Sequence, residues 1–324
     1  MGKDSTPIPR RTFGRTGETC TVLSMGCGFP IGFAGFERSV ETVRRAVSLG
    51  IHYFDTSPLY RAGASQAIVG EALAERDEPH LLATKVGHFK EARFFRSVEA
   101  MRVQLRENLR LLRRDAVDVL QVHEADWENW WVDRSDVGVC ELFDPQKSYD
   151  FAGAPVVEFL RQAKAEGFCR YIGITGNNAR HLTRLVAELD GIDSVLVAYN
   201  TMPLNASARD DLLPAAHKKG MAIVAAGLMT FVHRIPPGWR TEGTYFGKHA
   251  EEQLAALQKL QNASGLSMAE LVLRWGLADD RISTLLVGAC QPPEVEANAA
   301  AIVKGRLPAD LHEAIEIIAR QFER

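Results

Sequence analysis

Short apolar runs alternate with amphipathic stretches along nearly the whole chain, and each run predicts a buried strand. The predicted strands cover residues 22–28, 52–57, 81–87, 116–122, 170–176, 194–200, 221–227 and 282–289. Continuous apolar runs of this kind are typical of parallel strands that are covered on both faces. A stretch with helical periodicity follows each run, for example from Ser39, the predicted N-cap, to Gly50, the predicted terminal residue.

Eight strand–helix units without a long polar linker predict the α/β class and a closed (β/α)8 barrel. One domain would then span residues 1–324, with a flexible N-terminus at residues 1–10. An open doubly wound sheet is the alternative, but no G-x-G-x-x-G follows the first strand, so the usual dinucleotide fingerprint is missing. A turn at Arg15, Thr16 and Gly17 predicts a hairpin before the first strand, which could plug the lower end of the barrel.

Composition restricts the partners and the compartment. The 324 residues are 46% hydrophobic and 24% charged, and the net charge of -3 argues against nucleic acid and anionic membranes as main partners. The chain starts without a secretory signal and has no run of about 18 apolar residues, so we expect a cytoplasmic protein without a membrane span. Five scattered cysteines without a C-x-x-C pair predict reduced thiols.

Four residues with useful chemistry lie at or just after predicted strand ends: Asp55, Tyr60, Lys85 and His123. The carboxyl ends of barrel strands converge on one face, so we expect these residues to meet there. A lysine in an apolar strand is costly unless it is paired, and Asp55 is the expected partner.

A neighbouring ammonium lowers the pKa of a phenol, and His123 can orient a carbonyl or hydroxyl oxygen. Taken singly, Asp55 could cap a turn, Tyr60 could be a surface aromatic and His123 a satisfied core histidine. Together the four residues predict a proton relay in an active site.

This pattern, D-x-x-x-x-Y followed by a strand-ending lysine and a strand-ending histidine, resembles the aldo-keto reductases over roughly residues 11–303. The matching pieces include GRTG, LGIHYFDTSPLY, LLATKVG, DAVDVLQVHE and RYIGITG. The resemblance implies a single (β/α)8 barrel that binds NAD or NADP without a Rossmann domain and transfers hydride to or from the carbon bearing the substrate oxygen. It implies that Tyr60 is the acid or base, that Lys85 and Asp55 tune it, and that His123 orients the substrate.

Within that family the chain is most similar to the L-galactose dehydrogenases and the bacterial aldose 1-dehydrogenases, including L-fucose and D-threo-aldose enzymes. The pieces that carry this similarity are FDTSPLY, EGFCRYIGITG, DLLPAAHKKG and LLVGACQPPEVEANAA. The similarity implies a cyclic sugar whose C1 hydroxyl is oxidised to give a lactone.

Three rival interpretations belong to other classes. One is an NADPH-dependent aldehyde or ketone reductase, and a more remote one is a nucleotide-binding regulatory subunit like the barrels attached to potassium channels. A barrel metal hydrolase is disfavoured because no H-x-H pair or comparable ligand cluster appears at a strand end, and we expect no metal. The resemblance leaves open whether the chain is a monomer or a small homo-oligomer.

The resemblance also indicates which cofactor the chain prefers. Many relatives that use NADPH place a Lys-Ser pair and then an Arg after the eighth strand, where this chain has Gly288, Ala289 and Glu294. A carboxylate there would repel a 2'-phosphate, so NAD is favoured and NADP remains possible. Gln291 and Asn298 are candidates for the adenosine end, with helix capping and solvated surface as alternatives.

The nicotinamide end has fewer clear matches. Thr175 matches a position that holds the carboxamide in relatives, whereas Gly176, Leu196 and Ala226 depart from the residues that many relatives have there. The remaining predicted cofactor contacts are Gly26, Asp55, Gly176, Tyr199, Gly227 and Leu228.

The segment that follows His123 is longer than a usual barrel loop, and we expect residues 124–154 to form an extended substrate loop. Trp127, Trp130 and Trp131 occur there among carboxylates, a mixture suited to the apolar faces and hydroxyls of a sugar. We hypothesise a substrate-gripping lid, with a subunit contact or packing against the barrel rim as alternatives. Phe29, after the first strand, joins Tyr60 and His123 as a predicted substrate contact.

Overall fold

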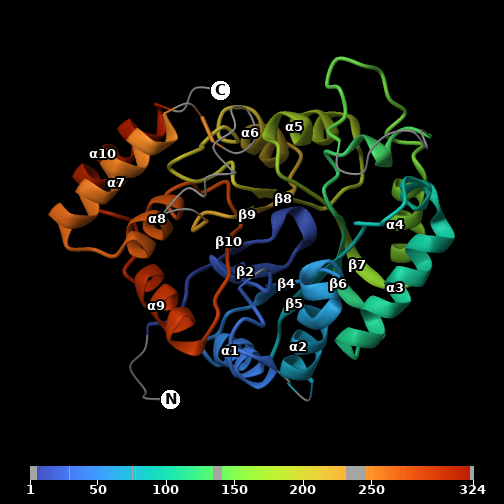
Figure 1. Ribbon diagram of the computed structural model, residues 1–324, viewed down its shortest axis with the longest axis horizontal. Coiled ribbons are helices and arrows are strands. Elements are labelled where there is room, and N and C mark those ends of the chain that lie inside the picture. The colour runs from blue at the N-terminus through green and yellow to red at the C-terminus, as the bar shows by residue number, and fades with distance from the viewer. Residues whose placement is uncertain are drawn as a thin grey trace.

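The computed structural model describes residues 6–28, 30–74, 76, 78–133, 141–230, 246–247 and 249–321. Eight parallel strands close into a barrel in the order β10-β3-β4-β5-β6-β7-β8-β9, and helices surround them (Figure 1). The strands are β3 (Leu23–Gly26), β4 (Tyr53–Asp55), β5 (Leu81–Val86), β6 (Val117–Val122), β7 (Cys169–Gly176), β8 (Ser194–Ala198), β9 (Ala222–Ala226) and β10 (Thr284–Val287). Each predicted strand is confirmed, and the closed ring excludes the open sheet.

Helices follow the strands around the ring and cover its outer face (Figure 1). They are α1 (Phe36–Ser48), α2 (Ala64–Leu73), α3 (Val98–Leu112), α4 (Pro155–Ala165), α5 (Ala179–Glu188), α6 (Leu212–Lys218), α7 (Ala250–Ser264), α8 (Met268–Gly276), α9 (Pro292–Val303) and α10 (Ala309–Ala319). Short 3-10 helices η1 (Gly14–Thr16), η2 (Tyr60–Gly63), η3 (Ala92–Arg96) and η4 (Glu128–Trp130) lie in the connections.

The predicted start of α1 at Ser39 is wrong. The helix begins at Phe36 with Gly35 as its N-cap, four residues before the predicted cap, because the exposed residues 36–38 continue the helix on its solvent side. The Ser39 hydroxyl donates to the Gly35 carbonyl at 2.6 Å and accepts from the Gly32 amide at 2.9 Å, so it joins the helix to the preceding turn. Gly50 lies just beyond the C-cap at φ 83°, in the left-handed conformation that glycine favours at helix ends.

Alternation along each strand divides the apolar residues between two cores. A large cluster fills the space between strands and helices, and a smaller one fills the barrel interior. On β5, Leu81 and Ala83 belong to the interior cluster, and two-residue periodicity carries the same row to Lys85. On β6, Val119 begins a row that continues to His123. The fold therefore delivers an ammonium and an imidazole to the carboxyl end of the interior.

The hairpin of β1 (Arg10–Thr12) and β2 (Thr19–Thr21) closes the opposite end of the barrel (Figure 1). Phe13 is fully buried in the interior cluster, with its ring centroid 5.4 Å from that of Tyr53. The Arg15 amide donates to the Gly220 carbonyl at 2.7 Å, just before β9 begins. These contacts confirm the predicted plug and leave the carboxyl ends of the strands as the face for a site.

The described cysteines Cys20, Cys27, Cys169 and Cys290 are free thiols, as predicted. Cys140 lies outside the described residues. In the described part of the chain, no helix combines the length and apolar character that a membrane crossing needs.

Candidate active site

An ion pair lies at the carboxyl end of the barrel interior, between the neighbouring strands β4 and β5. The Lys85 ammonium contacts a carboxylate oxygen of Asp55 and donates to the Thr56 carbonyl at 2.9 Å. Both side chains are almost fully buried, at 1% and 2% exposure. Burial lowers the pKa of Lys85, and the adjacent Asp55 opposes this effect. A buried charge is tolerated here because its partner is in contact.

Tyr60 lies above this pair, at the start of η2. Its ring centroid is 4.9 Å from the Lys85 nitrogen and 5.6 Å from the His123 ring centroid, with the two rings edge to face. The four predicted residues therefore come together at one end of the barrel, and the tyrosine is partly exposed while the ion pair beneath it is buried.

The pKa of Tyr60 moves in the opposite direction to the one expected from the sequence. Burial raises the pKa of the phenol well above its usual value, and the Asp55 and Glu124 carboxylates add to the effect. The Lys85 charge is largely offset by the carboxylate that it contacts, so it does not reverse this direction. Without a ligand, Tyr60 is therefore a neutral phenol at neutral pH.

His123 is held as a neutral imidazole. Its Nδ1 lies 3.0 Å from the Ser57 hydroxyl, and burial followed by the Lys85 charge lowers the pKa of the ring well below its usual value. The Ser57 oxygen already accepts from the Leu59 amide at 3.1 Å, which favours donation of its hydrogen to Nδ1. A hydrogen on Nε2 would then be available to a substrate oxygen.

Two partners of the four residues, Ser57 beside His123 and Gln121 beside Asp55, were missed by the sequence analysis. Gln121 donates to the second carboxylate oxygen of Asp55 at 2.8 Å and so fixes the acid from the side opposite Lys85. It lies two positions before His123, on the same face of β6. That spacing was a usable signal, because every second residue of a barrel strand points inward.

The predicted cofactor contacts around β3 and α9 border the same end of the barrel. Gly26 pairs with Asp55 in the strand register, and Gly288 follows β10 on the surface. A Cβ on Gly288 would lie 2.8 Å from a Pro30 side-chain carbon, and one on Gly28 would lie 3.9 Å from the Tyr60 ring. Gly288 thus lets the chain after β10 pass close to Pro30, whereas Gly28 leaves the side of the Tyr60 ring that faces it without a side chain.

The predicted adenosine-end residues Gln291, Glu294 and Asn298 belong to the start of α9. Gln291 is the N-cap residue but makes no side-chain cap bond, which does not support the capping alternative. The Glu294 carboxylate is fixed by the Cys290 amide at 2.7 Å. Gln291 and Glu294 are exposed and Asn298 is half-buried, so all three can be reached by a ligand.

The predicted nicotinamide-end residues are more buried. Thr175 donates its hydroxyl hydrogen to the Val122 carbonyl at 3.0 Å and accepts from the Glu124 amide at 3.1 Å, so one lone pair of its oxygen is left for a ligand. Tyr199 has φ 66° and Gly227 φ 72°, and a Cβ on Gly227 would lie 2.7 Å from the Tyr199 ring. Leu228 is fully buried, which leaves only its backbone for a ligand. Gly176 lies close to Asp126, whose carboxyl carbon would be 3.0 Å from an added Cβ.

The three tryptophans of the long loop are buried in the barrel rim. The Trp130 indole is 0% exposed and donates to the carbonyls of His123 and Glu124 at 3.2 and 3.1 Å. Trp131 donates to the Ala125 carbonyl at 2.8 Å. Trp127 is also buried. This burial supports packing against the rim, the alternative to a gripping lid, and the lid stays a prediction. Phe29 and residues 134–140 lie outside the described residues.

Comparison with known proteins agrees with this geometry. The model of the Aldo/keto reductase family matches residues 27–320. An L-galactose dehydrogenase of Arabidopsis thaliana is 30% identical, over 92% of this chain and 89% of its own. An NADH-specific methylglyoxal reductase of Escherichia coli (strain K12) is 26% identical, over 81% of this chain and 82% of its own.

Solved structures show the same fold. The holo form of the aldo-keto reductase AKR11C1 from Bacillus halodurans superposes with a TM-score of 0.73 at 22% identity and covers 96% of each chain. An aldo-keto reductase from Klebsiella pneumoniae in complex with NADPH gives a TM-score of 0.71 at 19% identity, with 98% of this chain and 97% of that chain covered. The match of the family model over nearly the whole chain therefore places this protein in the aldo-keto reductase family, as an NAD(P)-dependent oxidoreductase.

Proposed function

We propose that the protein oxidises the C1 hydroxyl of a cyclic aldose, of the L-galactose or L-fucose kind, to a lactone with NAD as the hydride acceptor. The observation that carries the substrate assignment is the 30% identity to an L-galactose dehydrogenase over 92% of the chain. Tyr60 and the three residues around it supply acid–base chemistry that suits such an oxidation.

Each residue has a separate task in this reaction. The Nε2 of His123 donates a hydrogen bond to the sugar oxygen and orients it, while Ser57 holds the other ring nitrogen. The Tyr60 oxygen, as phenolate, takes the proton of the C1 hydroxyl, and the C1 oxygen becomes a carbonyl oxygen as the C1–H bond breaks. A bound oxidised nicotinamide would accept the hydride. The buried Asp55 and Lys85 side chains hold the charge balance beneath the tyrosine.

The preference for NAD rests on the start of α9. Glu294 is exposed there, and the Cys290 amide fixes its carboxylate at 2.7 Å. A fixed carboxylate would repel the 2'-phosphate of NADP, whereas it can accept hydrogen bonds from ribose hydroxyls. The relative from Escherichia coli is named NADH-specific, in line with this choice, although the structure from Klebsiella pneumoniae holds NADPH.

A carbonyl reductase is the second candidate, and one observation favours it. The raised pKa of Tyr60 keeps the phenol protonated, which is the form that donates a proton to a substrate carbonyl. A relative 26% identical to this chain is named a methylglyoxal reductase. In carbonyl reduction the proton would pass from Tyr60 to the substrate oxygen, which is the reverse of its path in sugar oxidation.

A substrate panel tests the proposal. Nicotinamide absorbance would be followed with L- and D-aldoses and with simple aldehydes, each paired with NAD and NADP in the matching redox state. We expect turnover with one stereochemical group of aldoses and NAD. Inactivity with every aldose, alongside rapid NADPH-linked aldehyde reduction, would establish the reductase instead. The Tyr60→Phe protein, purified in parallel, controls for contaminating dehydrogenases.

A further inference from the structure

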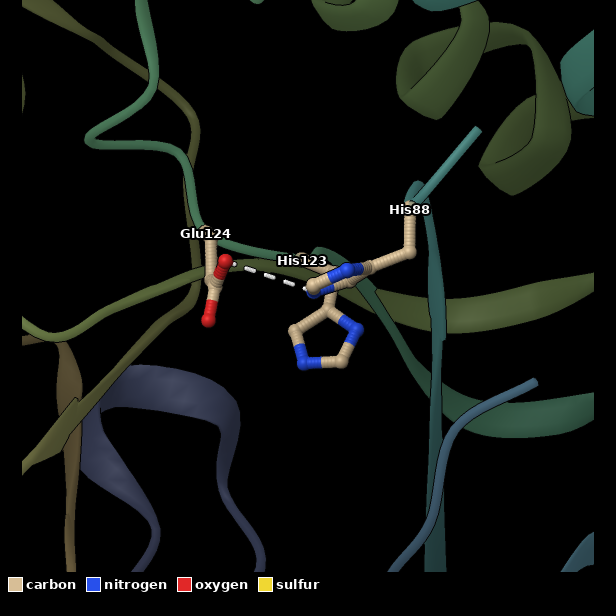
Figure 2. Close-up of side chains that lie close together, drawn as sticks. All are labelled: His88, His123 and Glu124. Atoms are coloured by element: carbon tan, nitrogen blue, oxygen red, sulfur yellow. Dashed lines mark ion pairs between the residues drawn. The ribbon is translucent and has the colours of Figure 1, made fainter. Parts of the chain in front are cut away.

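Two side chains that the proposed reaction does not use lie directly beside His123. His88 follows β5 and Glu124 follows β6, so both emerge at the carboxyl end of the barrel. Potential ligand atoms of His88, His123 and Glu124 all lie within 4.8 Å of one another. Figure 2 shows the His88 ring and the Glu124 carboxylate approaching each other next to the His123 ring.

His88 and Glu124 share a left-handed backbone conformation that is unusual for residues other than glycine. Their φ angles are 55° and 53°, in the left-handed region that costs a residue with a Cβ about 1–2 kcal/mol. The Thr175 hydroxyl accepts from the Glu124 amide at 3.1 Å and helps to hold this turn. Strain of this kind is found where the surroundings impose it, frequently at functional sites.

His88 and Glu124 each have one side-chain atom that makes no hydrogen bond within the described part of the chain. Among the described residues, the buried Nε2 of His88 and Oε2 of Glu124 have no hydrogen-bond partner, although they form an ion pair contact at 3.3 Å. The other carboxylate oxygen of Glu124 is held by the Asn177 amide group at 2.8 Å. When the His88 ring is neutral with its hydrogen on Nδ1, the pair therefore presents one nitrogen and one oxygen lone pair to the same small space.

Neighbouring groups hold these ligands in place. The His88 ring packs edge to face between His123 and Trp127, with centroid distances of 4.3 and 4.6 Å. Ser57 contacts Nδ1 of His123, and Asn177 fixes Glu124. Metal-ligating histidines and carboxylates are commonly oriented by such outer partners.

We propose that His88, His123 and Glu124 form a binding site for Zn²⁺. Two imidazoles and one carboxylate are a donor set that zinc takes in proteins, with a fourth position open to water. Donor atoms around a tetrahedral zinc are about 3.4 Å apart, so the present spacing of up to 4.8 Å requires only small side-chain rotations. The sequence analysis expected no metal because these ligands lie on two different strand ends.

Zinc at this site inhibits the enzyme. His123 bound to the metal cannot donate a hydrogen bond to a substrate oxygen, and the ion occupies space beside Tyr60. The inhibition is competitive with the substrate and is reversed by a chelator. This inhibition does not imply that turnover uses a metal, because the proposed reaction needs only the side chains and the nicotinamide cofactor.

Metal titration tests the site without turnover, so its result does not depend on the aldose assignment. The full chain, without an affinity tag, is titrated with Zn²⁺ against a chromogenic chelator, and with Co²⁺ while its absorption bands are recorded. We expect one site, with the dissociation constant raised about 100-fold or more in His88→Asn and in Glu124→Gln, since loss of a ligand costs more than loss of an outer partner. Asparagine suits position 88 because it tolerates the left-handed backbone.

Two controls separate this site from others. His249→Asn removes an exposed histidine that lies 2.8 Å from Glu252, and this variant should bind zinc as the unmodified protein does. Cys290→Ser removes the partly exposed thiol, and zinc inhibition should persist in it.

Three results would overturn the proposal. They are the absence of cobalt absorption bands in the unmodified protein, zinc binding that survives both ligand substitutions, and inhibition that disappears with Cys290→Ser. The cobalt spectrum of the unmodified protein decides the matter even if a substituted protein fails to fold.

Discussion

Burial has the largest influence on the protonation of Tyr60, Lys85 and His123. Burial raises the pKa of the phenol and lowers those of the ammonium and the imidazole, because each group loses solvation of its charged form. Among these three groups, Asp55 forms an ion pair with the lysine alone and so helps only that group to keep its charge. The site therefore combines one compensated ion pair with a neutral phenol that can exchange a proton with a substrate and a neutral imidazole that can hydrogen-bond to it.

Removing the Tyr60 hydroxyl should abolish turnover and leave cofactor binding nearly unchanged. General acid–base catalysis contributes about 10²–10⁴-fold, so kcat of Tyr60→Phe should fall at least 100-fold. Phenylalanine keeps the ring that packs against His123. Steady-state rates and a fluorescence titration with the cofactor measure the two quantities. Activity close to that of the unmodified protein would show that another group transfers the proton.

The Asp126 carboxyl should make stability depend on pH. Burial, followed by the charge of Glu124, raises the pKa of Asp126 from 3.8 to about 7, and the amides of Asn177 and Asn178 donate to one of its oxygens. Because the folded pKa is the higher one, this group contributes stability at low pH and loses it as pH rises from 4 to 7. A shift of this size corresponds to about 4 kcal/mol.

Asp126→Asn removes this titration and keeps an oxygen that can accept from both amides. The free energy of unfolding of the variant, relative to the unmodified protein, should therefore increase between pH 5 and pH 8. Urea unfolding at several pH values measures it. A difference that is the same at every pH would mean that Asp126 stays ionised in the folded state.

The hairpin of β1 and β2 is the element that closes the barrel away from the site. Its docking depends on Gly14, which has φ 56° and comes so close to the chain before β9 that an added Cβ would lie 2.6 Å from the Gly220 carbonyl oxygen. Backbone atoms cannot move aside as a side chain can. The glycine is thus required by both conformation and space.

Substitution of Gly14 by alanine should destabilise the protein by about 2–4 kcal/mol, from left-handed strain and overpacking combined. Gly17→Ala is the matched control, because Gly17 has φ 81° but no atom within 4 Å of an added Cβ. Its cost should be only the conformational part, about 1–2 kcal/mol. Thermal unfolding compares the two. Equal losses would show that the hairpin does not press on β9 at this point.

The barrel as a whole sets which direction of the reaction is favoured at a given pH, because its packing removes much of the Tyr60 side chain from water. Oxidation needs the phenolate, whose fraction rises with pH as long as the pKa lies above the pH of the assay. The kcat/KM for sugar oxidation should therefore increase from pH 6 to pH 9, while that for the reverse reduction should not increase. Both are measured in one buffer series. An oxidation rate that falls over this range would exclude Tyr60 as the base.

Much of the fold could be read from local patterns. The eight strands follow from apolar runs, and the hairpin follows from the turn at Arg15, Thr16 and Gly17, because such signals act over a few residues. The start of α1 was misplaced because polar residues on the exposed side of a helix carry no periodic signal. The positions of Lys85 and His123 at strand ends predicted their convergence, since parallel strands in a barrel bring their carboxyl ends together.

Local sequence thus specified the barrel, its plug and the residues that meet at its mouth, because each depends on periodicity and strand order. Properties that depend on distances between remote segments emerged with the folded chain. They include the raised pKa of Tyr60, the burial of Trp130 in the rim, and the meeting of His88 with Glu124. Desolvation and side-chain proximity arise from three-dimensional packing, and no pattern along the chain encodes them separately.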